Sequence, residues 1–168
     1  MISLEIEERI FDNSFSVDET LKYFSGDSDY TEDLLRMLDK ALCQINPGAI
    51  ETLLYACSCN GHLDQRYSLI LTRLLTEPKI QNHNLETVIE SLHFIKDPKT
   101  VDNLYEACLK FEYSDEHSIP IKAMWALRDI GTNRAIEKLI LLSKVEDGNI
   151  QRKAEQQLNY LNEKEEST

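Results

Sequence analysis

The sequence has few of the residues that interrupt helices, with only five Gly and four Pro among 168 residues. A turn-rich all-β fold uses many more of both, so their scarcity favours an all-α fold. Long apolar runs are also missing. No stretch approaches the roughly 18 apolar residues of a membrane-spanning helix, and the acidic start of the chain has too short an apolar run for a signal peptide. We therefore expect a cytoplasmic protein that makes no membrane contact.

Cysteine is sparse, and its four positions lack the paired spacing of a zinc site. The four are Cys43, Cys57, Cys59 and Cys108. Cys57 and Cys59 would lie on nearly opposite sides of a regular helix, so a redox pair is not expected. Three of the four fall in helical apolar patterns. We expect free thiols that act as small core residues in a reducing compartment.

Catalytic motifs are missing as well. His62, His83, His93 and His117 are scattered and show no His–Glu spacing of a zinc helix. No Gly-rich loop is present for phosphates, and no Ser or Cys nucleophile motif has an adjacent base. His93, beside Phe94, is expected on the flank of a helix. The sequence thus predicts no enzyme activity, no cofactor and no metal site.

Basic residues are outnumbered, because 18 Lys or Arg face 30 Asp or Glu, for a net charge of −12. Residues 1–33 hold ten acids against Arg9 and Lys22, a net of −8. Such a field repels phosphate backbones and attracts basic proteins. We therefore expect no nucleic-acid partner and a basic protein partner. The same acids would also serve simply to keep the protein soluble.

The chain does contain an internal repeat of a helical pattern. Four apolar or small positions recur at a constant offset of 31 residues: Ile119, Ala123, Leu127 and Ile130 precede Ile150, Ala154, Leu158 and Leu161. Periods of roughly 20 to 50 residues indicate stacked helical units. The sequence therefore predicts a stack of helices.

A helix–turn–helix junction is also present in three copies. The stretches SLHFIKDPKTVDNLYEAC and ALRDIGTNRAIEKLILLS align at an offset of 35 residues. The earlier stretch ALCQINPGAIETLLYACS has the same shape, with Ile45, Ile50 and Leu54 in the matching places. Each copy predicts two helices joined by a short turn.

This pattern predicts about eight helices and a short N-terminal helix. The short helix is expected over 16–24, where Ser16 caps it and Glu19 follows three residues on. The others are expected near 31–45, 47–60, 63–76, 85–95, 101–109, 119–130 and 150–161, with one more in the last junction. Residues 1–15 stay unassigned, and 77–84 is either an exposed loop or a short distorted turn.

The pattern divides the chain into an acidic N-terminal segment, 1–29, a helical repeat domain, 30–162, and a disordered tail, 163–168. The helices near 31–45 and 150–161 are apolar on one side, as expected of helices that close a stack. The helix over 119–130 is apolar on two sides, with Ile121 and Trp125 opposite its main stripe. Such a helix is expected inside a stack.

The junction AMWALRDIGTNRAIEKLI, preceded by the base Lys122, resembles the HEAT-like repeats first associated with phycobilin lyases. Their pattern is a base, spaced alanines, Leu, Ile-Gly, a short turn and an apolar helix. The resemblance is good over 119–161, fair over 85–111 and weaker over 34–57, and the extra length between 63 and 84 departs from it. It implies a right-handed α-solenoid of antiparallel helix pairs, a HEAT-like or ARM-type superhelix. Such repeats serve lyases, DNA glycosylases, adaptors and bacterial immunity proteins alike.

Our hypothesis from the sequence is a monomeric, non-enzymatic protein-binding module. Its most concrete form is a bacterial immunity protein that masks the active site of a basic, nuclease-type toxin, because complementary charge speeds capture. Two alternatives stay open. One is a phycobilin-lyase-type enzyme or chaperone subunit that binds a tetrapyrrole, and the other is an adaptor in a larger assembly.

The candidate partner-binding residues are acids of the N-terminal half and the acids and aromatics near one repeat. They are Asp27, Asp29, Glu32, Asp33, Tyr105, Glu112, Tyr113, Asp115, Glu116 and Trp125. Trp and Tyr dominate binding hot spots. Trp125 could instead stack between neighbouring repeats, where its truncation would cost roughly 3–5 kcal/mol of stability.

Overall fold

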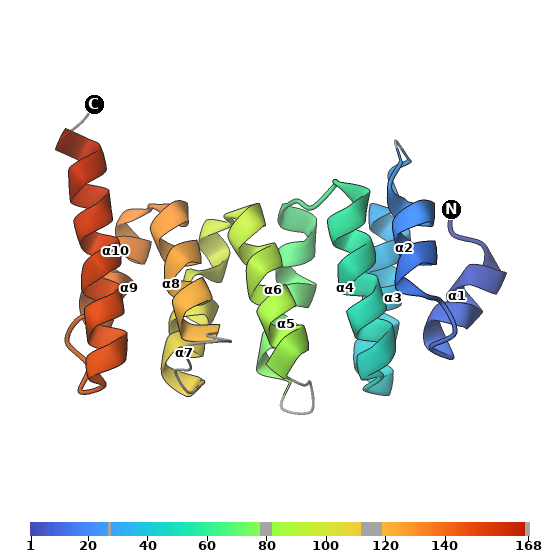
Figure 1. The fold of residues 1–168 in the computed structure, drawn as a ribbon, viewed down its shortest axis with the longest axis horizontal. Coiled ribbons are helices and arrows are strands. Elements are labelled where there is room, and N and C mark those ends of the chain that lie inside the picture. The colour runs from blue at the N-terminus through green and yellow to red at the C-terminus, as the bar shows by residue number, and fades with distance from the viewer. Residues whose placement is uncertain (27, 78–81, 112–118, 167–168) are drawn as a thin grey trace. The chain divides into compact units, whose positions relative to one another are not determined.

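The protein is all-helical over the residues that its structure describes, and no strand occurs among them. The structure is a computed structural model that describes residues 1–26, 28–77, 82–111 and 119–166. The helices within these ranges are α1 Leu4–Phe11, α2 Val17–Phe24, α3 Thr31–Gln44, α4 Pro47–Asn60, the 3₁₀ turn η1 Gln65–Tyr67, α5 Ser68–Thr76, α6 Asn82–Ile95, the 3₁₀ turn η2 Pro98–Thr100, α7 Val101–Lys110, α8 Ile119–Ile130, α9 Asn133–Leu142 and α10 Gly148–Glu166 (Figure 1). The chain divides into two compact units, Met1–Ser91 and Leu92–Thr168, and the division falls within α6.

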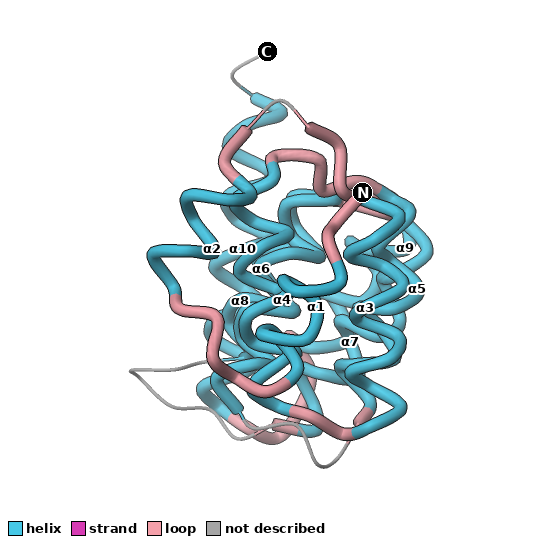
Figure 2. Tube along the Cα trace, turned by 90° about the vertical axis from the view of Figure 1, so that its right-hand side faces the viewer, coloured by secondary structure: helices cyan, strands magenta, loops and turns pink. Residues whose placement is uncertain are grey.

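Helix α4 is the centre of unit 1, because α1, α2 and α3 all pack against it. Its buried residues are Ala49, Ile50, Leu53, Leu54, Ala56, Cys57 and Asn60. In Figure 2, α2 and α4 lie on one side of this unit and α3 and α5 on the other. Burial of so much apolar surface on one helix makes α4 the element on which unit 1 assembles.

The first 24 residues belong to this packing. Residues 4–11, which the sequence left unassigned, form α1, and Ile10 is fully buried. The Asn46 side chain, which caps α4, also donates a hydrogen bond from Nδ2 to the Phe11 carbonyl at 3.0 Å. The expected short helix is confirmed as α2, where Ser16 and Glu19 form a capping box.

The sequence predicted that the helix near 31–45 closes one end of the stack, but α3 has neighbours on both sides. Met37 and Leu42 are buried in addition to the expected stripe. The polar side of α3 is covered too, because Arg36 Nη2 lies 2.6 Å and Lys40 Nζ 2.8 Å from the carboxylate of Glu7 on α1. The prediction of a terminal helix failed because α1 was not recognised.

Two further predictions in unit 1 need correction. The helix expected over 63–76 begins only at Ser68, after η1, and Leu69 is 73% exposed rather than deeply buried. Helix α6 begins at Asn82, three residues earlier than expected, so part of the irregular segment 77–84 is helical. Residues 78–81 of that segment lie outside the described residues.

Three of the turns between helices share one local backbone geometry. A left-handed residue is followed by an extended N-cap in Ile45–Asn46, Lys96–Asp97 and Gly131–Thr132, with φ of 50°, 54° and 64° at the first residue. In each pair the second side chain accepts a backbone N–H two or three residues on. These bonds satisfy donors that the first turn of a helix leaves unpaired.

Residues at three fixed distances from the N-cap are buried after all three of these turns. They are Ala49, Thr100 and Ala135 at the third position, Leu53, Leu104 and Leu139 at the seventh, and Ala56, Ala107 and Leu142 at the tenth. The sequence alignment was therefore wrong by one residue at the first junction, because Leu53 rather than Leu54 corresponds to Leu104.

Unit 2 is built around α8, which packs against α7, α9 and α10. In Figure 2, α8 and α10 lie on one side of this unit and α7 and α9 on the other. The residues of α8 that are buried include Ala123, Met124, Ala126 and Leu127. The expected second apolar side is absent, because Trp125 is 41% exposed and Ile121 is half-buried.

Helix α10 differs from its predicted form in two ways. Leu158 and Leu161 are only half-buried, whereas Gln157 is buried and accepts a hydrogen bond from Arg128 Nη1 at 3.0 Å. The helix also continues to Glu166, so the first four residues of the expected disordered tail, 163–168, are helical.

The left-handed turn positions predict opposite effects for two substitutions. Gly131→Ala should lower the free energy of unfolding by about 1 kcal/mol, because a left-handed backbone is unfavourable for a residue with a Cβ atom. Lys96→Gly should raise it by a similar amount. Gly26→Ala is the control, since Gly26 has open space around it and no left-handed φ. Urea denaturation measures all three, and equal signs for the first two would contradict the prediction.

The Glu7 cluster predicts a specific loss of stability in acid. Hydrogen bonds from Arg36 and Lys40 lower the pKa of Glu7 from 4.5 to about 2. Because this folded pKa lies below the unfolded one, the carboxylate stabilises the protein above about pH 4.5 and loses that effect as the pH falls toward 2. Glu7→Gln should therefore lower the free energy of unfolding by about 2 kcal/mol at neutral pH and flatten its fall in acid.

Glu8→Gln is the matched control for this measurement, because Glu8 is exposed on the same helix and makes no salt bridge with a described residue. It should change the free energy of unfolding at neutral pH by less than about 0.5 kcal/mol, because exposed substitutions away from specific contacts have small effects. Parallel stability curves for wild type and Glu7→Gln between about pH 2 and 7 would contradict the assigned role of Glu7.

Candidate functional site

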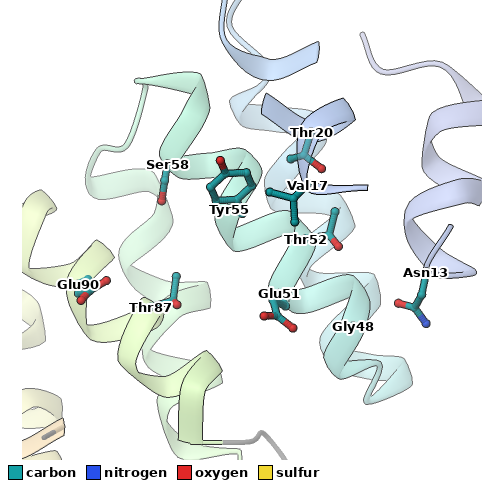
Figure 3. A pocket seen from close by; sticks show the side chains of 10 residues that line it. All are labelled: Asn13, Val17, Thr20, Gly48, Glu51, Thr52, Tyr55, Ser58, Thr87 and Glu90. Carbon is teal, nitrogen blue, oxygen red and sulfur yellow. The ribbon is translucent and has the colours of Figure 1, made fainter. Parts of the chain in front are cut away.

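A groove of about 700 Å³ lies in unit 1 on the face formed by α2, α4 and α6. Its lining residues are mostly polar: Asn13, Val17, Thr20, Gly48, Glu51, Thr52, Tyr55, Ser58, Thr87 and Glu90 (Figure 3). The set offers five hydroxyl groups, two carboxylates and one amide, and the described lining contains no Lys or Arg. The groove is therefore acidic and rich in hydrogen-bonding groups.

Helix α4 supplies half of this lining from a single stripe. Glu51, Thr52, Tyr55 and Ser58 follow one another at spacings of three or four residues, so they lie on one side of the helix. The opposite sides of α4 are buried against α1, α2 and α3. The groove is thus the place where a largely buried helix keeps its polar side chains.

Gly48 shapes the end of the groove nearest the start of α4. A Cβ atom at this position would lie 2.2 Å from the side-chain oxygen of Asn13. Glycine therefore allows the turn between α1 and α2 to close against α4, which brings Asn13 into the lining.

Helix α2 and helix α6 form the two flanks of the groove (Figure 3). On α2, Thr20 is almost fully buried, and its Oγ1 donates to the Ser16 carbonyl at 2.9 Å. On α6, Thr87 and Glu90 are three residues apart and share a side of the helix. The groove is therefore walled by helices, which hold side chains more precisely than loops do.

Tyr55 is the aromatic side chain of the groove. The charge of the neighbouring Cys59 thiolate, when that forms, raises the pKa of Tyr55, and a hydrogen bond between the two groups acts in the same direction. The phenol therefore stays protonated at neutral pH. It offers both a hydrogen-bond donor and a ring face.

Most of the basic residues of unit 1 form salt bridges with carboxylates of the same unit. Residues 1–91 carry sixteen Asp or Glu and seven Lys or Arg, a net of −9. Five of these bases form salt bridges with carboxylates of the unit: Arg9, Arg36, Lys40, Arg66 and Arg73. By contrast, no salt bridge to a described residue is made by the exposed carboxylates of Glu5, Glu8, Asp12 and Asp18. Unit 1 therefore presents a surplus of negative charge.

The acids that the sequence singled out lie outside the groove. Asp29 and Glu32 gather around Arg66, whose nitrogens lie 3.8 Å and 3.5 Å from their carboxylates, together with Asp64 at 2.7 Å. Asp33 accepts the backbone N–H of Ile2 at 2.9 Å. The structure therefore brings Asp29 and Glu32 together around Arg66, but in a network of salt bridges within unit 1. Asp27 lies outside the described residues.

The aromatic candidates belong to unit 2, and their positions differ. The Lys138 ammonium lies 4.3 Å from the ring centroid of Tyr105, a cation–π contact within the unit. Trp125 is 41% exposed on α8, so it does not stack in the core as an interior helix would require. Four other candidates lie outside the described residues: Glu112, Tyr113, Asp115 and Glu116.

Unit 2 contains a smaller cavity of about 290 Å³, lined by Lys96, Arg128, Asp129, Gly131, Tyr160 and Leu161. Its charged groups bind one another. Arg128 Nε donates to Asp129 Oδ1 at 2.6 Å, and the guanidinium carbon lies 4.6 Å from the Tyr160 ring centroid. His93 Nε2 lies 2.8 Å from Asp129 Oδ2, which agrees with its expected place on a helix flank. This cavity is less suited than the groove to capture a charged partner.

The cysteines are free, and two behave as the sequence predicted. Burial raises the pKa of Cys57 to about 12 and also raises the pKa of Cys108, so both thiols stay protonated in the core. Cys43 is exposed, so it is not the small core residue that was expected. No group of three or more potential metal ligands occurs in the part of the chain that the structure describes.

No family model, curated protein or solved structure matches this chain. Among the described residues, the helices are all too short or too polar to cross a lipid bilayer. The resemblance to HEAT-like repeats accordingly stays a prediction.

The sequence did not single out the groove, although a signal was present. Residues 51, 52, 55 and 58 form a polar stripe on a helix whose other positions are almost all apolar. Which side of α4 stays uncovered depends on the packing of α1 and α2, and α1 had no assignment. The polar stripe alone would not have distinguished a groove from an ordinary surface.

The exposure of Trp125 predicts a small effect of its removal on stability. Trp125→Ala should lower the free energy of unfolding by less than about 1.5 kcal/mol, well below the 3–5 kcal/mol typical of a buried Trp. Leu127→Ala on the same helix is the comparison, since Leu127 is fully buried and should cost about 3 kcal/mol. Chemical denaturation followed by circular dichroism gives both values. A larger loss for Trp125 than for Leu127 would show that the Trp is a core residue.

Proposed function

We propose that this chain is a non-enzymatic protein-binding module that captures a basic protein through unit 1. The observation that supports the proposal is the helix-walled groove, whose described lining contains carboxylates and no Lys or Arg. The surrounding unit has a net charge of −9, and five of its bases are engaged in salt bridges. A cleft lined by one sign of charge concentrates its field and speeds association with an oppositely charged partner.

The most concrete form of this function is an immunity protein that masks the active site of a nuclease-type toxin. Nucleases hold phosphates with Lys and Arg, so the surface around their active sites is basic. An acidic protein with hydrogen-bonding groups can occupy that surface in place of the nucleic acid. In this proposal the module works as a cytoplasmic monomer without a cofactor.

The proposal includes a HEAT-like, right-handed α-solenoid of antiparallel helix pairs as the scaffold. Its support is local: three turns share a left-handed residue followed by an N-cap, and three positions counted from each cap are buried. Repeats of this kind place binding residues on the surface of a regular framework.

The two other functions have less support. The tetrapyrrole of a phycobilin-lyase-type protein carries propionate groups, which favour Lys or Arg, and the described lining of the groove instead carries Glu51 and Glu90. An adaptor in a larger assembly would also bind proteins. A basic, enzymatically active partner would distinguish the immunity function from it.

Capture of a partner from the source cells tests this function. The tagged protein should retain a basic protein, and the association rate of the purified pair should fall at least about tenfold between about 0.1 M and 1 M salt, because the screening length falls from about 10 Å to 3 Å. For an immunity protein, an equimolar amount should also abolish the partner's cleavage of plasmid DNA. An acidic partner, or an association rate that salt does not change, would contradict the proposal.

A further inference from the structure

We propose that the groove on α2, α4 and α6 is the docking site for an arginine side chain of the partner, held by Glu51 on α4 and Glu90 on α6. This inference rests on the proposed function and specifies its contact. The partner is thus a basic protein that presents a protruding arginine to unit 1.

The size and walls of the groove fit one protruding side chain and its flanking backbone. A volume of about 700 Å³ lies within the range of about 300–1,000 Å³ typical of ligand pockets. The walls are three helices, and no strand edge is available among the described residues for an added strand. Recognition must therefore come from side chains.

The lining favours a cation over other occupants. Glu51 and Glu90 contribute two carboxylates to the groove, and among its described lining residues there is no Lys or Arg, so the lining favours a cationic side chain over an anionic one. Hydroxyl groups of Thr52 and Thr87 can accept hydrogen bonds from the same cation. An apolar side chain would displace water from this polar lining without replacing the hydrogen bonds of that water, which is costly.

Arginine fits the groove better than lysine. Its planar guanidinium presents five donors, which can bind a carboxylate through two parallel hydrogen bonds. The guanidinium also stacks on aromatic rings, and Tyr55 contributes an aromatic ring to the lining of the groove (Figure 3). Lysine would keep the charge and lose both the bidentate bond and the stacking.

The other exposed carboxylates of unit 1 have a different role. Glu5 and Glu8 lie on α1 and do not line the groove. They add to the long-range field that brings a basic partner close, an effect that salt screens. Glu51 and Glu90 would instead form short-range bonds once the arginine has entered.

Titration of the ¹⁵N-labelled protein with short acetylated peptides tests this assignment. Three Gly-X-Gly peptides are used, in which X is Arg, Lys or citrulline, the neutral isostere of Arg. The Arg peptide should shift the amide resonances of α4 residues 48–58 and of α2 and α6, and its affinity should exceed that of Lys severalfold and that of citrulline at least tenfold. Shifts spread evenly over all acidic segments, or equal binding of citrulline, would overturn the proposal.

A pair of double variants separates the groove from the general field. Glu51→Gln with Glu90→Gln should weaken binding of the Arg peptide and of the purified partner at least tenfold, whereas Glu5→Gln with Glu8→Gln, the same change of charge on α1, should weaken it less than about threefold. All four side chains are exposed, and the melting temperature of each variant is measured beside its affinity, so that a loss of stability is distinguished from a loss of binding. Tyr55→Phe should retain most of the affinity and Tyr55→Ala should lose several-fold.

The outcomes distinguish this inference from the proposed function. Equal weakening by the two double variants, with salt-dependent binding of a basic partner still present, would overturn the groove as the docking site and leave the function standing. Selective binding of the Arg peptide in the groove, with no basic partner captured, would support the site and contradict the function.

Discussion

The rest of unit 1 depends on the burial of helix α4. Three helices cover it, and each aliphatic side chain that this packing removes from water contributes about 1.5–3 kcal/mol. Asn60, the buried polar residue of α4, is paired, because its side chain donates to the Ser28 carbonyl at 2.8 Å. The other polar residues of the helix lie on the side that its neighbours leave uncovered, because an unpaired polar group in the core would be costly. The stripe of Glu51, Thr52, Tyr55 and Ser58 follows from that constraint. The groove is thus a consequence of how the core is built.

The same packing explains where the few bases of unit 1 go. Arg9 joins α1 to the capping box of α2, Arg36 and Lys40 join α3 to α1, and Arg73 joins α5 to Asp39 on α3. Each of these salt bridges links different helices. Exposed salt bridges contribute little individually, but Glu7 is nearly buried and holds two cations, so its network is stronger. Because the bases are used as links between helices, the remaining carboxylates determine the field outside.

The sequence predicted helices wherever period and caps agreed, as in α2, where a capping box marks the start. The prediction from sequence failed where the residue type does not indicate the backbone conformation that the residue adopts. Ile45 takes the left-handed position that Gly131 takes elsewhere, and a β-branched residue gives no sign of that backbone, so the first junction was misaligned by one residue. Trp125 was expected on a second buried side because the repeat pattern assumes equal neighbours. Its exposure depends on which helices pack against α8, and the repeat pattern of a single sequence does not show that packing.

The candidate site shows why departure from a repeat was an incomplete guide to function. The acids chosen on that basis, such as Asp29 and Glu32, surround Arg66 and serve the structure of unit 1. The groove instead lies on the most regular helix of the unit, and its residues do not interrupt the helical pattern. A binding group gains from a rigid support, because less conformational freedom is lost when the partner arrives. Carboxylates on α4 and α6 satisfy that condition. For an acidic protein whose charge is widely spread, such rigid placement is what distinguishes a specific contact from attraction alone.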